Sequence, residues 1–187
     1  KRTYEMHPAE LNELVARAIE TFRYRFERER AVVQLQQNGD PPHCWVDEQA
    51  ITLAVINLLD NAVKYAGSTP VEVLIETQAE EIQIRVRDHG PGIPTSDLKR
   101  VFERFYRSQS RGKTRGSGIG LALVKHIAEA HGGRAWAENA PDGGAIVGIS
   151  LPRREPSQRA AEGSSLRRGA DASIDSPERA DIVARHG

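Results

Sequence analysis

Apolar residues near the start of the chain recur with helical spacing. Between Pro8 and about Arg30 they follow an i, i+3, i+4 pattern, and charged residues occupy the opposite arc. The stripe consists of Leu11, Leu14, Val15, Ala18, Ile19, Phe22 and Phe26. This pattern predicts one amphipathic helix with Pro8 in its first turn and with the stripe facing the core. An exposed seam for a partner is the alternative.

A second helical pattern, between Asp47 and Gly67, carries a polar face as well as an apolar one. Asp47 suits the N-cap and Gly67 the C-terminal end. The apolar face consists of Ile51, Val55, Leu58, Leu59, Ala62 and Val63. The polar face consists of Asn57, Asn61, Lys64 and Tyr65, because positions i, i+4, i+7 and i+8 share one side of a helix. Buried amides need polar partners, so this face indicates a polar ligand such as a nucleotide with its divalent metal.

Period-two alternation and short apolar runs predict strands. They are Val32–Gln36, Trp45-Val46, Val71–Ile75, Ile82–Val86, Arg134–Glu138 and Gly144–Leu151. Val71–Ile75 and Ile82–Val86 are predicted to be adjacent antiparallel strands with one buried face. The last two read as a closing pair around an Asp142-Gly143 turn.

The segment between these strands is predicted to contain two more helices. Pro94–Arg104 has the pattern of a short helix, and Ser117–Ala130 that of a longer one, ended by His131-Gly132-Gly133. Residues 107–117 form a polar, cationic loop. After Pro152 bulky apolar residues become rare, so we expect disorder there, because little burial offsets the entropy of ordering. Only Ala180–Arg185 has the pattern of a transient helix.

Composition narrows the classes of function. Lys+Arg and Asp+Glu both number 26 in 187 residues, so net charge favours neither nucleic acid nor an anionic membrane. No apolar run reaches the length of a bilayer span, and nothing resembles a signal peptide. The single cysteine, Cys44, excludes an internal disulfide framework and suits a reducing compartment.

Asp88-His89-Gly90-Pro91-Gly92-Ile93 follows a predicted strand. Its glycines allow a backbone to approach a ligand closely, and its carboxylate can accept a hydrogen bond from an exocyclic amine such as that of adenine. A simple Asp–Gly turn explains this segment alone equally well.

Gly116-Ser117-Gly118-Ile119-Gly120-Leu121 opens a predicted helix. A helix N-terminus presents backbone N–H groups to an anion. The segment is not a dinucleotide-binding motif, because such a motif follows a strand and no strand precedes this helix. It is not a P-loop either, because no Gly-Lys-Ser/Thr follows.

Cationic residues lie between these two segments, from Phe102–Arg107 to Arg111, Lys113 and Arg115. Alone, such a run is typical of a solvated surface. Beside a glycine-rich helix start it favours a lid whose cations meet phosphates.

In this order, the segments resemble the catalytic and ATP-binding domain of sensor histidine kinases, within the gyrase, chaperone, histidine-kinase and mismatch-repair ATPase superfamily. Asn57–Tyr65 matches the N box, Asp88–Gly92 the G1 box, Val101–Arg107 the F box and Gly116–Leu121 the G2 box. The match runs from about Pro8 to Leu151. It implies the Bergerat ATP-binding fold, an α/β two-layer sandwich with helices on one face of a mixed, mostly antiparallel sheet.

The resemblance also implies roles on the central helix, with ATP and Mg²⁺ as cofactors. Asn61 would bind Mg²⁺ through its carboxamide oxygen, with Asn57 on the metal or on a metal-bound water. Lys64 would reach phosphate, and Tyr65 would lie near the ribose or adenine.

In the other boxes, Asp88 would read the adenine amino group while Gly90 and Gly92, next to Ile93, make room for the base. Arg104 or Arg107 would contact the terminal phosphates from the lid. The triphosphate would lie on the G2 segment, which supplies Gly116, Ser117, Gly118, Ile119, Gly120 and Leu121.

One position separates kinase from ATPase in this resemblance. The gyrase and chaperone branches carry a water-activating Glu where this chain has Asn57, which cannot act as a general base. Asp60 lies about 100° from Asn61 around the helix. We therefore expect phosphoryl transfer to a histidine rather than efficient hydrolysis.

The resemblance implies an acceptor histidine outside this chain, because no matching segment is present. Residues 1–7 would link to an upstream dimerisation domain, 8–152 would form the ATP-binding domain, and 153–187 would form a disordered tail.

Expected partners are that dimerisation and histidine-phosphotransfer domain and, indirectly, a response regulator, with no nucleic acid and no membrane contact. The location would be cytoplasmic, including as the cytoplasmic part of a membrane-bound sensor.

Two departures and two alternatives accompany this interpretation. His7, just before Pro8, is not expected to be the acceptor, and Ala145 stands where the family often has Ser or Thr. A stand-alone kinase of the anti-sigma type, which phosphorylates serine, tends to keep the Glu that Asn57 replaces. A degenerate module that senses nucleotide or docks a partner is disfavoured because all four boxes are intact.

Overall fold

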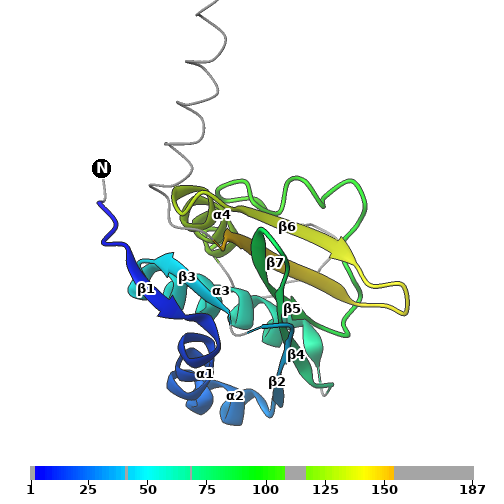
Figure 1. The fold of residues 1–187 in the computed structure, drawn as a ribbon. Coiled ribbons are helices and arrows are strands. Elements are labelled where there is room, and N and C mark those ends of the chain that lie inside the picture. The colour runs from blue at the N-terminus through cyan, green and yellow to red at the C-terminus, as the bar shows by residue number, and fades with distance from the viewer. Residues whose placement is uncertain (1–2, 41, 68, 108–116, 154–187) are drawn as a thin grey trace, which may run out of the picture. The chain divides into compact units, whose positions relative to one another are not determined.

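Five strands form the main sheet, in the order β2-β4-β5-β7-β6 (Figure 1). The computed structural model describes residues 3–40, 42–67, 69–107 and 117–153. The strands are β2 (Val33–Asn38), β4 (Val71–Thr77), β5 (Glu81–Arg87), β6 (Arg134–Asn139) and β7 (Ala145–Pro152). Strand β2 is parallel to β4, and every other neighbouring pair is antiparallel. The expected mixed, mostly antiparallel sheet is therefore confirmed.

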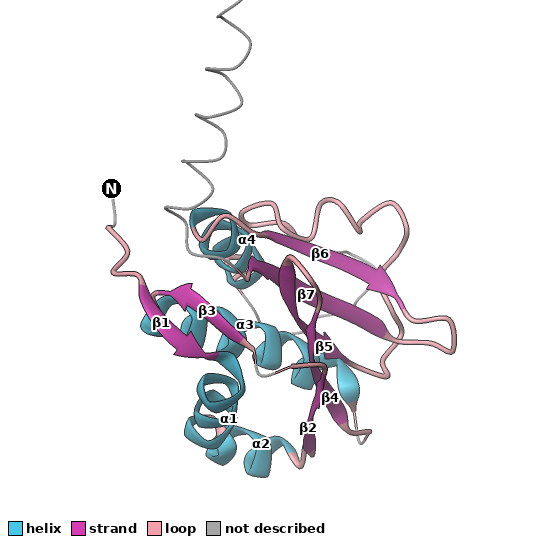
Figure 2. Ribbon diagram, in the orientation of Figure 1, coloured by secondary structure: helices cyan, strands magenta, loops and turns pink. Residues whose placement is uncertain are grey.

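Helices cover one face of this sheet. They are α1 (Leu11–Thr21), α2 (Arg23–Glu29), α3 (Glu48–Ala66) and α4 (Gly120–Ala130) (Figure 2). Burial alternates along β4 and β5, so Val73 and Ile84 face the core while Arg85 faces away. This alternation confirms the sheet with one buried face and the two-layer arrangement.

Helix α3 lies at the centre and packs against α1, α4 and three strands of the sheet. All six residues of its predicted apolar face are buried. The carboxylate of Asp47 accepts a hydrogen bond from the N–H of Ala50 at 2.9 Å, and Gly67 follows the last turn. Both predicted ends are confirmed, and the opposite face of α3 is left for polar side chains.

The predicted helix from Pro8 to Arg30 was wrong in two places. Pro8 lies in β1 (His7–Glu10), which pairs with β3 (His43–Val46) as a second, two-stranded sheet. The helix starts only at Leu11, whose N–H donates to the Pro42 carbonyl at 3.0 Å. It breaks at Phe22, and α2 begins at the next residue. The apolar stripe nevertheless faces the core as predicted, since Leu14, Val15, Ala18 and Phe26 are among its buried members.

Turns replace the short helix predicted for Pro94–Arg104. The N–H of Asp97 bonds to the carbonyl of Pro94, and that of Arg100 to the carbonyl of Asp97. Such i+3 closures make successive turns, and the chain then takes a left-handed conformation at Phe105 (φ 64°). Helix α4 starts at Gly120, later than the predicted Ser117.

Several predictions lie outside the described residues. They include the cationic loop at 108–116, with Gly116, and the tail from 154, with the weak helix at Ala180–Arg185. Within the described part, no helix has the length and apolarity to cross a bilayer.

Candidate nucleotide-binding site

Asn57 and Asn61 are half-buried side chains one turn apart on the polar face of α3. The amide group of Asn57 donates to the carbonyl of Leu53 at 2.8 Å. Its side-chain oxygen lies 2.8 Å from the place where a Cβ atom on Gly120 would stand. The N-terminus of α4 therefore lies directly against the carboxamide face of α3, although the two segments are distant in the sequence.

This carboxamide pair fits a metal that is shared with a ligand. The described residues contain no group of three or more His, Cys, Asp or Glu side chains able to hold a metal ion. Mg²⁺ takes oxygen ligands and keeps several waters, so one or two carboxamide oxygens together with phosphate oxygens suit it. The donor set does not suit a metal held by protein alone.

An ion network occupies the part of α3 beside the carboxamides. Asp60 accepts from the guanidinium of Arg25 on α2 at 2.9 Å and also pairs with Lys64, one turn further along α3. All three side chains are about a quarter to a third exposed. Asp60 is thus paired with two cations, and that it does not serve as a base stays a prediction.

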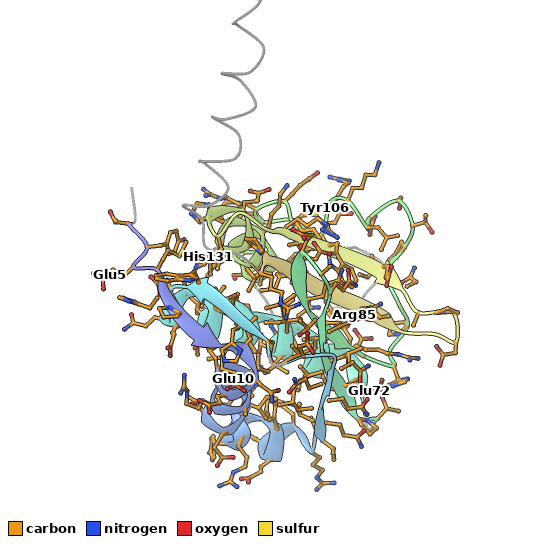
Figure 3. The ribbon with its side chains drawn as sticks, in the orientation of Figure 1. Glu5, Glu10, Glu72, Arg85, Tyr106 and His131 are labelled. Atoms are coloured by element: carbon orange, nitrogen blue, oxygen red, sulfur yellow. The ribbon has the colours of Figure 1, made fainter. Side chains whose placement is uncertain are left out.

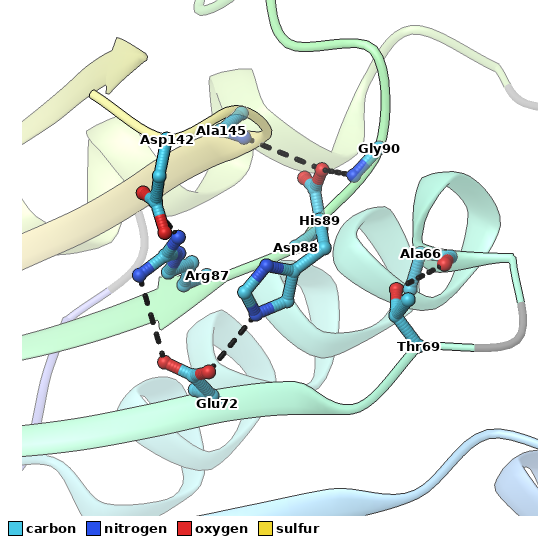
Figure 4. A network of polar contacts seen from close by, with 9 residues as sticks. All are labelled: Ala66, Thr69, Glu72, Arg87, Asp88, His89, Gly90, Asp142 and Ala145. Carbon is cyan, nitrogen blue, oxygen red and sulfur yellow. Dashed lines mark hydrogen bonds and ion pairs between the residues drawn. The ribbon is translucent and has the colours of Figure 1, made fainter. Parts of the chain in front are cut away.

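Asp88, at the end of β5, is fixed in place by backbone groups. Its side chain is buried, and its Oδ1 atom accepts from the N–H groups of Gly90 at 2.9 Å and Ala145 at 3.3 Å (Figure 4). The backbone N–H of Asp88 donates in turn to the carbonyl of Ala145 at 2.9 Å. This carboxylate is therefore held rigidly at the start of the G1 segment.

Backbone groups approach positions 90 and 144 so closely that only glycine fits there. A Cβ atom on Gly90 would stand 2.3 Å from the carbonyl oxygen of Tyr65, at the end of α3. A Cβ atom on Gly144, which has φ +84°, would stand 1.9 Å from the carbonyl oxygen of Asp88. Side chains at either position would separate the G1 segment from α3 or from β7.

A chain of ion pairs ties the G1 segment to the β6–β7 turn. Glu72 accepts from His89 at 2.9 Å and approaches Arg87 at 4.0 Å, and Arg87 donates to Asp142 at 2.6 Å (Figure 4). The Arg87 hydrogen bond holds the pKa of the Asp142 carboxyl below its ordinary value, and Asp142 raises the pKa of Arg87. These contacts support the loop from the outer face of the sheet.

A family model described as histidine kinase-, DNA gyrase B- and HSP90-like ATPase matches residues 46–155, more than half of the chain. The chain belongs to this family. The match covers all four predicted boxes, and it confirms the resemblance on which the expected roles rest.

The similar proteins are sensor histidine kinases. The chain is 46% identical over 121 residues to the signal transduction histidine-protein kinase AfsQ2 of Streptomyces coelicolor, covering 64% of this chain and 22% of AfsQ2. The solved mycobacterial sensor histidine kinase MprB is 30% identical with a TM-score of 0.68, covering 79% of this chain and 97% of that one. Full-length ShkA, solved in complex with AMPPNP, is 23% identical with a TM-score of 0.71, covering 81% and 32%. This last likeness bears on the fold alone.

In this ATPase domain the G2 segment lies partly within the described residues. Ser117, Gly118 and Ile119 precede α4, while Gly120 and Leu121 form its first turn. Gly118 accepts from the N–H of Phe105 at 2.9 Å through its carbonyl, so the F box and the G2 box meet here. Gly116 is outside the described part.

The described residues of the F box end in a polar, exposed stretch. Arg104 and Arg107 are both solvent-exposed. The guanidinium of Arg100 stacks on the Tyr106 ring at 4.2 Å, and a hydrogen bond with Asp97 raises the pKa of Tyr106. Arg100 thus stacks on the turn series, and Arg104 and Arg107 lie at the end of the described range 69–107.

His131 is a structural histidine of this domain. Its Nε2 atom accepts from the N–H of Asp47 at 3.0 Å, and its Nδ1–H donates to the carbonyl of Ile127 at 2.7 Å. Tyr4 packs on the ring with 5.2 Å between centroids. Burial lowers the pKa of this imidazole. Tyr106 and His131, which come from distant segments, are labelled in Figure 3.

Sequence reasoning missed Asn139, at the end of β6. Its carboxamide accepts from the N–H of Ile93 and donates to the carbonyl of the same residue, both at 2.7 Å. Nothing in the sequence distinguishes this asparagine from a turn residue, because its partner lies 46 positions away.

Proposed function

We propose that this chain is the ATP·Mg²⁺-binding catalytic domain of a sensor histidine kinase. It would deliver the γ-phosphoryl group to a histidine on a separate dimerisation domain, for onward transfer to a response regulator. The supporting observation is the contact between Asn57 and Gly120, which sets one carboxamide of the α3 pair beside a helix N-terminus. The chain spans only 22% of the length of AfsQ2. Kinase activity, which belongs to a whole kinase, is therefore proposed for this chain only as part of a larger protein.

The residues of α3 and α4 would share the work on the triphosphate. Asn61 and Asn57 would hold Mg²⁺, which supplies charge neutralisation on the phosphate oxygens when bound. The N–H groups in the first turn of α4 and the positive end of its dipole would bind phosphate. Lys64 would add a cation once phosphate competes with Asp60 for its ammonium group.

Asp88 and its loop would select and orient the base. A carboxylate fixed by two backbone N–H groups accepts a hydrogen bond from an exocyclic amine without reorganising. Gly90 and Gly92 would leave space for the ring, and Tyr65, whose carbonyl oxygen borders Gly90, would lie near the ribose or the base. The description of the matching family as a histidine kinase-, DNA gyrase B- and HSP90-like ATPase supports an adenine nucleotide as the ligand.

Transfer is favoured over hydrolysis because α3, which is described throughout, places no available general base beside Asn61. Asn57 carries no titratable group, and Asp60 is paired with Arg25 and Lys64. Catalysis would then consist of positioning and of electrostatic stabilisation of the phosphoryl group. Arg104 or Arg107 would contact the terminal phosphate from the lid.

The remaining parts of the chain complete the proposal. Residues 1–7 would lead from the dimerisation domain, residues 8–152 would bind ATP, and residues 153–187 would be a tail, with the whole segment in the cytoplasm. His7 pairs with Val46 in the β1–β3 ladder, a position that suits a linker rather than a phosphoacceptor.

The decisive experiment supplies the acceptor. The chain is mixed with a dimerisation domain that carries an acceptor histidine, and with γ-labelled ATP and Mg²⁺. We expect acid-labile, alkali-stable phosphate on the acceptor histidine, lost when that histidine is replaced by Gln. Acid-stable serine phosphate would instead favour the stand-alone kinase. Binding of ATP with no transfer to either acceptor would favour a nucleotide-sensing module.

A further inference from the structure

One cross-strand pair holds both ends of the G1 segment, residues 88–93. Asn139 of β6 and Ala145 of β7 are partners in the antiparallel register. Ala145 bonds Asp88 at the start of the segment through its backbone, at 2.9 and 3.3 Å. Asn139 bonds Ile93 at the end of the segment through its side chain, at 2.7 Å twice. The end of the β6–β7 hairpin therefore acts as a template on which this loop lies.

The chemistry at Asn139 is that of a peptide group. A carboxamide offers one acceptor oxygen and an N–H donor on neighbouring atoms, so it pairs with the N–H and C=O of Ile93 as a ladder partner would. Ile93 is only 3% exposed, and buried backbone groups are costly to leave unpaired. Among residue types of this size, only Asn presents the donor and the acceptor on two separate atoms at neutral pH.

Gly92 makes this contact possible. Its φ is +75°, and a Cβ atom there would stand 2.9 Å from the Asn139 side-chain oxygen. The backbone of the loop can approach the carboxamide closely only because residue 92 has no side chain. The bond at Ile93 and the glycine of the G1 box are thus parts of one arrangement.

We propose that Asn139 is a positioning residue for the nucleobase site. It contacts no nucleotide itself. By fixing Ile93 it sets where residues 90–92 lie relative to the Asp88 carboxylate, so it determines the space left for the base. This inference rests on the proposed nucleotide-binding function.

Asn139→Asp gives the sharpest test. The carboxylate accepts from the N–H of Ile93 but faces the Ile93 carbonyl without a proton to donate. We expect the Kd for ATP and for ADP to rise about tenfold at pH 8, the loss expected for one or two such bonds. When the carboxyl is protonated at acid pH, its O–H replaces the lost donor. Because an ordinary aspartate carboxyl has a pKa of about 3.9, the ratio of variant Kd to wild-type Kd should begin to fall toward one as the pH decreases to about 4.

Two variants control this experiment. Asn139→Ala should raise both Kd values by a similar factor, with a ratio to wild type that does not vary with pH. Asn38→Asp makes the same substitution at the exposed end of β2 and should bind as wild type does. Because the Asn139 side chain lies at the surface, far-UV circular dichroism should show all three variants folded.

The outcomes separate the two proposals. A wild-type chain that binds no adenine nucleotide contradicts the proposed function. A wild-type chain that binds, with Asn139→Asp and Asn139→Ala binding equally well, overturns the positioning role. Unfolding of Asn139→Ala also overturns it, because the side chain would then serve the whole fold. A Kd ratio for Asn139→Asp that stays constant with pH contradicts the peptide-like bond.

Discussion

The carboxamide oxygen of Asn57 and the α-carbon of Gly120 face each other so closely that a Cβ atom on Gly120 would stand 2.8 Å from that oxygen. The amide nitrogen of Asn57 is bonded to Leu53, so the carboxamide has a fixed orientation. This contact brings the polar face of α3 to the first turn of α4. A metal-bound triphosphate would need both surfaces at once.

Gly120→Ala should therefore weaken nucleotide binding without weakening the fold. Alanine favours a helix interior over glycine by about 1 kcal/mol, and because Gly120 is the first residue of α4 the thermal stability should change by less than this. The new methyl group must displace the Asn57 carboxamide, and we expect the Kd for Mg·ATP to increase about tenfold or more. Isothermal titration calorimetry measures the Kd for Mg·ATP, and differential scanning calorimetry measures the thermal stability.

A double substitution controls this prediction. Once Asn57→Ala has removed the carboxamide, Gly120→Ala should add little further loss, because contacting residues couple. Additive losses would mean that Gly120 matters for another reason, such as direct backbone contact with phosphate.

Asp60→Asn should strengthen ATP binding at low ionic strength. Asp60 holds Lys64 and places a carboxylate near the proposed phosphate site. Removing one negative charge there should lower the Kd for ATP roughly two- to fivefold, and salt should reduce the gain. Glu81→Gln, which breaks the pair with Arg134 at the opposite end of β5 from Asp88, should change the Kd little. Weaker binding by Asp60→Asn would instead show that Asp60 positions Lys64.

His131 should make stability depend on pH. Burial lowers its pKa below the ordinary value of 6.5, so the unfolded chain takes up a proton before the folded one does. The contribution of the neutral imidazole is complete above pH 6.5 and is lost as the pH falls toward the folded-state pKa, by at most about 1.4 kcal/mol per pH unit. The nearby Asp47 carboxylate opposes this shift in part.

Urea unfolding at pH 7.5, 6.5 and 5.5 measures that slope. His131→Gln keeps an acceptor for the Asp47 N–H but cannot be protonated in this range. The variant should be less stable at pH 7.5 and should show a smaller slope below pH 6.5. Identical slopes for both proteins would assign the pH dependence to other groups.

Periodicity predicted most of the fold because it records which face of each element is buried. The alternation of Val71, Val73 and Ile75 located β4, and the apolar face of α3 was predicted residue by residue. Asp47 and Gly67 marked the ends of α3 through chemistry that acts within one turn. The four boxes identified the family for a similar reason, since their residues and order can be read directly from the chain.

Tertiary contacts decided what local patterns could not. Pro8 looked like a first helical residue, but pairing with Trp45 drew it into a strand. The helix after Leu11 breaks at Phe22, although the apolar stripe continues without a gap into α2. Asn139 had no local signal at all, because its role depends on a loop that precedes it by 46 residues.

If α3 presents carboxamides to a magnesium-held triphosphate, Asn61→Ala should abolish the part of ATP binding that depends on Mg²⁺. The measurement is the calorimetric Kd for ATP with and without Mg²⁺, for wild type, for Asn61→Ala and for the control Asn12→Ala on α1. We predict that Mg²⁺ strengthens ATP binding by wild type and Asn12→Ala, and that this gain disappears in Asn61→Ala. An undiminished Mg²⁺-dependent gain in Asn61→Ala would contradict the account.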